Sequence, residues 1–378
     1  MKKYYVLTPG PTPVPPEVAA KTSLPIIHHR TKEFEKIFTE VEEGLKEVFL
    51  TQHDIFIIAS SGTGAMESAV VNLLSPGDKV LVASCGVFGN RWIKILESYG
   101  IKPITYCEEW GKEVSPEKIK DILLKNEDIK VVYTTHTETS TGTVNDIQSI
   151  SKTIKENSNA ILVVDAISGL GGQELRMDDW GVEVVVTGSQ KGLMNAPGLA
   201  FVAVNERIWP VVEKASLPRF YFDWRQMKKM LSKKQTPFTP AVTLIIGVNE
   251  AIKRIKEEGI ENLWRYYEKL SFATREAAKA LGLEIFSSRP SAVVTAIKSP
   301  PTVDSTKLVH MLRDKYGISI ADGQDVLKGK IFRIAHMGYI NEFDIITCVS
   351  AVEKGLSELG YNVEYGKGVS AAESILFS

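Results

Sequence analysis

The sequence has few cysteines, few histidines and no long apolar run. Its three cysteines, Cys85, Cys107 and Cys348, are far apart and form no CxxC pair, so they provide neither a zinc motif of that kind nor the four thiolates of an ordinary iron–sulfur cluster. A chain of 378 residues buries enough surface on folding to need no disulfides. We therefore expect a protein without disulfides or a metal cluster.

Membrane and secretion signals are also missing. The longest apolar stretches, such as residues 55–59, are far shorter than the roughly 20 residues that a membrane-spanning helix needs. The N-terminal segment has two lysines but lacks the apolar core and cleavage site of a signal peptide. We expect a cytosolic protein.

Neither sign of charge is in excess, since 45 basic residues face 46 acidic ones and the formal net charge is −1. No basic run suggests a nucleic-acid partner, and no charged block suggests a tail. The sequence contains 33 lysines and 32 glutamates but only 7 glutamines. This bias resembles that of hyperthermophile proteins, which is a hint about the source and not about the chemistry.

Between residues 55 and 205, short runs rich in Val and Ile alternate with longer amphipathic stretches. This pattern predicts an α/β fold, with a mostly parallel seven-stranded sheet covered by helices on both faces. The expected strands are Ile55–Ala59, Lys79–Ala83, Pro103–Tyr106, Lys130–Thr134, Ile161–Asp165, Glu183–Thr187 and Ala200–Val204. The expected helices include Ala65–Leu74, Arg91–Tyr99, Pro116–Lys125 and Ile147–Asn157.

The later part of the chain has a different pattern. We expect irregular structure over 207–245, one long helix over 244–280, and then a smaller α+β domain. The final segment, 366–378, fits either a docked arm or a frayed tail. The expected division is an N-terminal arm (1–20), a large domain (21–255) and a small C-terminal domain (256–378).

Polar residues gather where the expected strands end, which is where ligands bind in open α/β sheets. The run Ser60–Ala65 follows the first strand, and its small residues and helix N-terminus suit a phosphate. The run matches neither the dinucleotide glycine fingerprint nor a P-loop, and a simple capped turn is the alternative. Asp165 ends another strand, as either a helix cap or a functional acid.

Lys191 lies in a small-residue loop after the strand that ends at Thr187, and it is a candidate Schiff-base amine. Taken alone, a solvated surface lysine is the commoner interpretation. Together, a phosphate cradle, a carboxylate and a lysine on one rim match the needs of pyridoxal phosphate, which uses a lysine and an acid near its ring nitrogen.

These residues and the motifs around them resemble those of the class V pyridoxal-phosphate aminotransferases, in particular the alanine–glyoxylate and serine–pyruvate branch. The resemblance extends from residue 8 to about 360 and implies the fold type I architecture. Its most specific motifs are SSGTGAMESA (60–69), HTETSTG (136–142), VDAISGLGG (164–172), GSQKGLMNAPGLAF (188–201) and FRIAHMG (332–338).

The resemblance implies a role for each matching position. Lys191 would form the internal aldimine, and Asp165 would bind the pyridinium nitrogen. The phosphate would be held by Thr63, Gly64 and Ala65 with help from Gln190.

Further positions follow from the same resemblance. Phe88 would stack on the cofactor ring, Thr139 would lie near the ring oxygen, and Arg333 would bind the substrate carboxylate. The alternatives are a core aromatic for Phe88 and a small-domain salt bridge for Arg333. Family members are homodimers, and Gln235 and Thr236 match a segment that reaches the neighbouring subunit's phosphate.

The implied activity is a ping-pong transaminase that moves an amino group from alanine or serine to glyoxylate or pyruvate, with aspartate left open as a donor. One alternative is a cysteine desulfurase or lyase, although Cys348 falls within an expected helix. A second is a non-catalytic accessory protein like a hydrogenase subunit. A nicotinamide dehydrogenase lacks the glycine fingerprint. The segment His28–Arg30 has no third ligand spaced to join it in a metal site.

Overall fold

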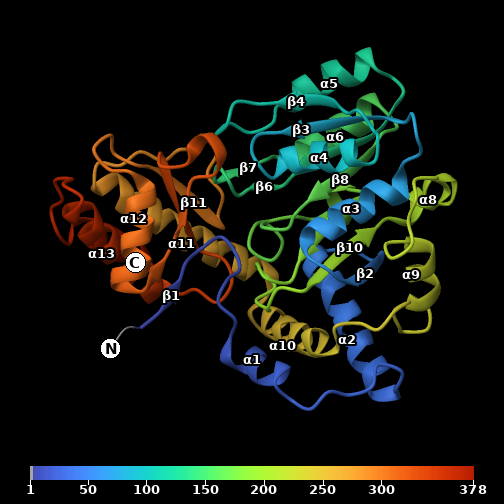
Figure 1. Ribbon diagram of the computed structural model, residues 1–378, viewed down its shortest axis with the longest axis horizontal. Helices are drawn as coiled ribbons and strands as arrows, with labels where there is room; N and C mark the ends of the chain where they lie inside the picture. Colours follow the sequence, from blue (N-terminus) through green and yellow to red (C-terminus); the bar gives the residue numbers. More distant parts are fainter. Residues whose placement is uncertain (1–2) are drawn as a thin grey trace.

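The seven strands expected over residues 55–205 form one sheet in the computed structural model, which describes residues 3–378 (Figure 1). The first two residues of the expected N-terminal arm lie outside the described residues. The sheet order is β2-β10-β9-β8-β5-β3-β4. Its strands are β2 (Asp54–Ala59), β3 (Lys79–Ser84), β4 (Ile104–Cys107), β5 (Ile129–Thr135), β8 (Ile161–Asp165), β9 (Val184–Gly188) and β10 (Leu199–Val204).

Only β10 runs against its two neighbours, β2 and β9, and the remaining pairs are parallel. Every residue of β8, β9 and β10 is buried, which explains why these strands have almost continuous apolar sequences. The predicted α/β class and mostly parallel sheet are confirmed.

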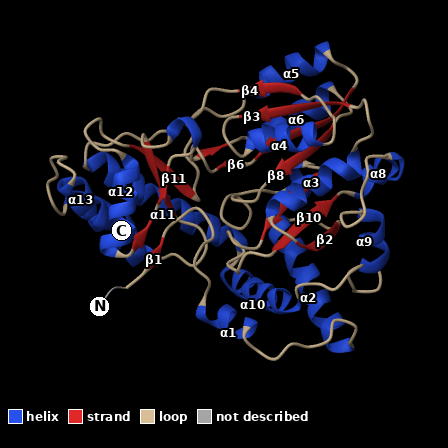
Figure 2. Ribbon diagram, in the orientation of Figure 1, coloured by secondary structure: helices blue, strands red, loops and turns tan. Residues whose placement is uncertain are grey.

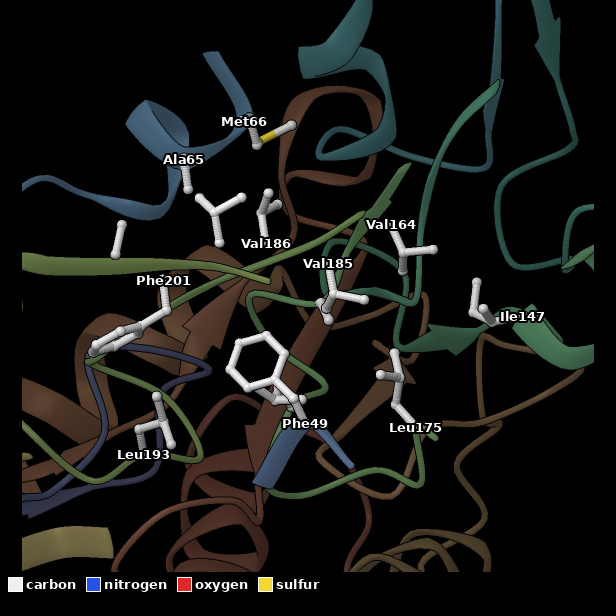
Figure 3. Packing of buried hydrophobic residues seen from close by; sticks show 14 of the residues in the cluster. Phe49, Ala65, Met66, Ile147, Val164, Leu175, Val185, Val186, Leu193 and Phe201 are labelled. Carbon is white, nitrogen blue, oxygen red and sulfur yellow. The ribbon is translucent and has the colours of Figure 1, made fainter. Parts of the chain in front are cut away.

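Helices cover the sheet on both faces (Figure 2). They are α1 (Pro16–Thr22), α2 (Lys32–Phe49), α3 (Gly62–Leu73), α4 (Gly89–Ser98), α5 (Pro116–Lys125), α6 (Ile147–Asn157) and α7 (Met177–Trp180). Figure 3 shows Ala65 and Met66 of α3 on one side of β9, and Phe49 and Leu193 on the other. Val185 and Val186 of β9 lie between these groups, so the sheet is packed from both sides.

The segment 207–245 is more ordered than the sequence suggested. A single 3₁₀ turn (Glu206–Ile208) leads into α8 (Trp209–Lys214), and α9 (Trp224–Leu231) follows. Trp224 is fully buried, and its Nε1 donates a hydrogen bond to Ser68 of α3. The expectation of irregular structure was wrong there. Helix α9 buries Trp224, Met227 and Leu231 at helical spacing, a short periodic pattern that the sequence analysis overlooked.

The single long helix expected over 244–280 is two helices, α10 (Val242–Glu258) and α11 (Ile260–Ala280). They meet at Gly259, whose φ of +80° and ψ of 130° interrupt the helical backbone. The apolar pattern continues across the break, but α10 packs on α1 and α2 whereas α11 packs on α13 and α14. The chain therefore crosses between its two parts at Gly259, and the proposed domain limits stay a prediction.

The smaller part is built on an antiparallel sheet of order β11-β14-β13. Its strands are β11 (Val294–Lys298), β13 (Ala321–Asp322) and β14 (Ile331–Ala335), and its helices are α12 (Ser305–Met311), with a π-helical turn over Leu312–Tyr316, and α13 (Glu342–Glu358). A 3₁₀ turn covers Asp325–Leu327, and β6 (Thr137–Glu138) and β7 (Thr143–Val144) form a small hairpin after β5.

The last segment is docked rather than frayed. It forms α14 (Lys367–Leu376), which packs against α11 and α13. Ala372 and Leu376 are buried, and the buried carboxylate of Glu353 accepts hydrogen bonds from the backbone N–H groups of Gly366 and Gly368.

The N-terminal segment connects both parts of the molecule. Strand β1 (Tyr5–Val6) pairs in parallel with β12 (Ile318–Ser319) of the smaller part, as Figure 1 shows at the left. The chain then passes to the large sheet, where the Thr12 N–H donates to the carbonyl of Gln190. Among the described residues, no helix is long and apolar enough to cross a membrane.

The break between α10 and α11 generates a stability prediction. Gly259→Ala places a Cβ in a backbone conformation that suits only glycine, so we expect a loss of about 1–3 kcal/mol in the free energy of unfolding, measured by urea titration. The control Glu257→Ala, an exposed position in α10, changes it by less than about 0.5 kcal/mol. A Gly259→Ala variant as stable as the wild type contradicts the role given to this glycine.

Candidate active site

Six strands of the large sheet run in the same direction and end at one edge. The segments that leave this edge after β2, β3, β5, β8 and β9 carry most of the residues singled out in the sequence. This arrangement explains how residues more than 100 positions apart come together, because the carboxyl ends of parallel strands share an edge.

The N-terminus of α3 forms the first part of the site. Its cap residue, Ser61, makes no side-chain hydrogen bond to the helix. The N–H groups of Gly62 and Thr63 therefore stay open, while the Gly64 N–H donates to the Ser61 carbonyl at 2.9 Å. Gly64 is packed so closely that a Cβ there would overlap with Ser60, and Thr63 is only half-buried. A 12-residue helix with a free, positively polarised N-terminus suits an anion.

Asp165, which is buried, and Lys191, which is half-buried, are titratable groups at the same edge. The carboxyl of Asp165 is 3% exposed and accepts a hydrogen bond from the Ile167 N–H at 2.8 Å. Burial raises the pKa of Asp165 to about 7, against the lowering effect of that hydrogen bond and of nearby Lys191. Burial lowers the pKa of Lys191 to about 8, although Asp165 attracts its proton. Both groups are thus held near their titration points at neutral pH.

The segment after β1 forms one wall around Lys191. The Lys191 ammonium group donates to the carbonyl of Pro9, and the Thr12 hydroxyl donates to the Lys191 carbonyl at 3.1 Å. Gly10 has a φ of +127°, and a Cβ at this position would overlap with the Lys191 side chain. The N-terminal segment therefore fixes the path of the lysine side chain.

Gln190 directly precedes Lys191 in the chain, and its side-chain oxygen is uncommitted. The Oε1 atom of Gln190 is buried and has no hydrogen-bond partner among the described residues. This orphaned group, the open helix N-terminus and the Asp165–Lys191 pair fit the phosphate, ring nitrogen and aldehyde of pyridoxal phosphate.

Phe88 is half-buried at the start of α4, and its backbone is held by a residue that the sequence analysis missed. The buried carboxylate of Glu138 accepts hydrogen bonds from the N–H groups of Phe88, Gly89 and Ser140 at 2.9–3.1 Å, and also from the Ser140 hydroxyl. The signal for Glu138 was its charge within the otherwise small and polar motif HTETSTG, at a position that continues a buried strand.

Thr139 and Arg333 meet at the boundary between the two parts of the molecule. The Thr139 hydroxyl donates to Ser168 at 2.6 Å, and Arg333 donates from Nη1 to the Thr139 carbonyl at 2.9 Å. Nε and Nη2 of Arg333 donate to the carbonyl of Asp322. Within the described residues Arg333 forms no salt bridge, so the alternative of a small-domain ion pair was wrong. Burial lowers the pKa of Arg333 to about 10.

Gln235 and Thr236 are not brought to this site by hydrogen bonds within the described chain. Arg30 donates to Oε1 of Gln235, and the Thr236 hydroxyl donates to the Phe238 carbonyl at 2.7 Å.

In residues 3–378 no group of three or more His, Cys, Asp or Glu side chains is arranged to hold a metal ion, including the segment His28–Arg30.

A separate hollow of about 480 Å³ lies beside the α10–α11 junction and includes Met194 in its wall. Several of its polar side chains are already engaged. Tyr266 donates to Glu342, Tyr267 donates to the Gly338 carbonyl, and Asn341 caps α13 together with Asp344.

Comparison with known proteins gives the same assignment along the whole chain. The family model described as aminotransferase class-V matches residues 4–341. The chain is 40% identical to a Synechococcus protein named soluble hydrogenase, small subunit, over 99% of this chain and 98% of that one. It is 36% identical to a serine–glyoxylate aminotransferase from Methylorubrum extorquens, over 98% of this chain and 96% of the other.

Among solved structures, ureidoglycine–glyoxylate aminotransferase from Bacillus subtilis superposes with a TM-score of 0.95 at 29% identity, covering 100% of this chain and 99% of the other. The likeness extends over both parts of the molecule, so the expected fold type I architecture with a small C-terminal sheet domain is confirmed.

The lowered pKa of Lys191 generates a prediction for the cofactor-free protein. Only the neutral amine is nucleophilic, so its reaction rate with an amine-directed reagent should rise with pH and reach half of its maximum near pH 8. An ordinary lysine does so near pH 10.4. Peptide mass mapping measures the modification of Lys191.

The variant Asp165→Asn removes the negative charge that favours the protonated amine, so the midpoint should move to lower pH. A wild-type midpoint at or above pH 10 contradicts the environment described for Lys191.

Proposed function

The chain belongs to the class V aminotransferase family, and from this premise we propose that it transfers an amino group from a small amino acid to glyoxylate or pyruvate. It is an aminotransferase with pyridoxal phosphate as cofactor. Alanine and serine are the proposed donors. The observation that carries the proposal is the Asp165–Lys191 pair at the strand edge, beside the open N-terminus of α3.

The bound cofactor supplies an electron sink that stabilises the carbanion left when a proton leaves the substrate Cα. As a carboxylate, Asp165 would stabilise a protonated ring nitrogen, whose positive charge would favour ionisation of this buried group. Lys191 Nζ would hold and move the proton that leaves the substrate Cα, and its pKa of about 8 would allow both uptake and release near neutral pH.

Two more regions orient the reacting groups in this proposal. Thr63, Gly64 and Ala65 hold the phosphate, with Gln190 beside them, while Phe88 packs on the ring and Thr139 lies near the ring oxygen. Arg333 binds the substrate carboxylate. Three of its five N–H groups are used by main-chain carbonyls, so two remain for a carboxylate.

We propose a homodimer whose interface lies beside the phosphate cradle. Phe220 is 73% exposed and contacts Phe238, and the adjacent Tyr221 stacks on Phe238 and donates to the Ala59 carbonyl at the end of β2. This aromatic cluster adjoins Gln235 and Thr236, which we propose to contact the partner's phosphate. An exposed apolar cluster of this kind favours a subunit contact. A cytosolic location and a thermophilic source remain proposals from the sequence.

Two of the three cysteines are poorly suited to a desulfurase, and the third, Cys107 at the end of β4, is exposed but has a thiol pKa raised by partial burial. Cys348 is buried in α13, and burial raises its pKa to about 12, so its reactive thiolate is scarce at neutral pH. Burial also raises the pKa of Cys85, which lies after β3. The accessory role suggested by the hydrogenase-named relative does not require an Asp165–Lys191 pair, so the intact pair favours an enzyme.

The proposed reaction is tested with purified protein and a panel of L-alanine, L-serine and L-aspartate against glyoxylate and pyruvate. We expect transamination with alanine or serine and parallel double-reciprocal plots. Lys191→Ala should lower kcat by about 10²–10⁴-fold because the proton carrier is lost, whereas Lys94→Ala on the exposed face of α4 should not. Sulfide release from cysteine without any transamination would favour the desulfurase instead.

The proposed dimer is tested by light scattering. The wild type should have a mass of twice 41.8 kDa, and Phe220→Asp should shift it toward the monomer and weaken cofactor binding. Leu124→Asp, which also places a charge at an exposed apolar residue but on α5, should stay dimeric. A monomeric wild type, or a dimeric Phe220→Asp with unchanged cofactor binding, contradicts the proposed interface.

A further inference from the structure

Arg91 is a charged residue at the site to which neither the motifs nor the resemblance gave a role. It lies in the first turn of α4, three residues after Phe88, and is half-buried. It forms no salt bridge with any carboxylate in residues 3–378. A half-buried guanidinium without an acidic partner is costly unless another group of opposite charge completes its surroundings.

Two contacts of Arg91 connect parts of the site that come from different strands. Its Nη1 donates a hydrogen bond to the Thr63 hydroxyl at 3.1 Å, and Thr63 belongs to the first turn of α3. The centre of its guanidinium lies 4.8 Å from the centroid of the Phe88 ring. One planar group thus contacts both the α3 N-terminus and the ring beside it.

The hydrogen bond from Arg91 has a consequence for Thr63. A hydroxyl has one hydrogen and two lone pairs, so a hydroxyl that accepts from Arg91 keeps its own hydrogen free to donate elsewhere. The open N–H groups of α3 and the positive charge of Arg91 lie beside that hydrogen. Together they form a cluster of donors that favours an anion.

The charge of Arg91 also reaches the reacting pair. It favours the ionised carboxylate of Asp165 and disfavours the protonated amine of Lys191, so it lowers the pKa of both groups. The carboxylate nearest to Phe88, Glu138, is occupied by backbone N–H groups and leaves Arg91 without a counter-charge.

We propose that Arg91 is a positioning residue that joins the phosphate end of the cofactor site to Phe88. Its guanidinium orients the Thr63 hydroxyl toward the phosphate and holds the Phe88 ring by a cation–π contact. This inference rests on the proposed function for the identity of the anion, and it concerns binding rather than turnover.

The test measures binding of pyridoxal phosphate and of phosphate-free pyridoxal to the cofactor-free protein, by absorbance and by the circular dichroism induced in the cofactor band. Arg91→Met should weaken pyridoxal phosphate binding about tenfold, since a charge-assisted hydrogen bond is lost, and pyridoxal binding less. Arg91→Lys keeps the charge but not the planar fork, so it should bind with intermediate affinity. The induced dichroism should decrease in Arg91→Met because the Phe88 ring is less fixed.

The coupling to Thr63 is measured by a double-mutant cycle. If Arg91 acts through the Thr63 hydroxyl, the factor by which Arg91→Met/Thr63→Val lowers the affinity for pyridoxal phosphate is smaller than the product of the factors for the two single variants. Lys94→Met, which removes another positive charge from α4 at an exposed position, is the matched control and should bind like the wild type. Thermal unfolding of each cofactor-free variant identifies those that fail to fold.

The inference is overturned if Arg91→Met binds pyridoxal phosphate as tightly as the wild type does, or if its affinities for pyridoxal phosphate and for pyridoxal fall by the same factor. It is also overturned if the affinity of the double variant falls by the full product of the two single-variant factors. These binding measurements are made without an amino acid or an oxo acid, so they do not depend on turnover. A wild type that binds the cofactor but transaminates nothing therefore contradicts the proposed function alone, and an unaffected Arg91→Met in an active enzyme contradicts this inference alone.

Discussion

The opposition between burial and attraction at Asp165 and Lys191 is the constraint on which the site depends. Burial drives both groups toward their neutral forms, while their opposite charges favour ionisation. The balance places both pKa values near neutrality, where a carboxyl can share a proton and an amine can carry one. A large, fully packed sheet is what makes such burial possible, because its edge excludes water from the strand ends.

The surrounding segments keep this pair in place from separate directions. Pro9 and Gly10 confine the Lys191 side chain, and they come from a segment whose strand pairs with the smaller part of the molecule. Glu138 fixes the loop that carries Phe88, and Arg333 ties the smaller sheet to the chain after β5. Movement of the smaller part would therefore be transmitted to Lys191 and to Arg333 together.

The sequence was most informative where local pattern and topology agree. Continuous Val and Ile runs predicted the strands within one or two residues, and the strand-end rule brought Asp165 and Lys191 to one edge.

Features set by distant contacts were missed. The partners of Glu138 lie about 50 residues earlier in the chain, and the helix at Trp224 depends on packing against α3. At Gly259 the apolar pattern hid a break that the positive φ of a glycine permits. Whether Gln235 and Thr236 reach a partner's site depends on how a second subunit packs, and the sequence pattern of one chain does not specify that packing.

We propose that the amine of Lys191 is the group that holds the cofactor. Borohydride reduction of the protein loaded with pyridoxal phosphate, followed by peptide mass spectrometry, tests it most directly. We expect a single phosphopyridoxyl group on Lys191. The group should be absent from protein that was treated with excess L-alanine or L-serine before reduction. Modification of a different lysine, or of none, would contradict it.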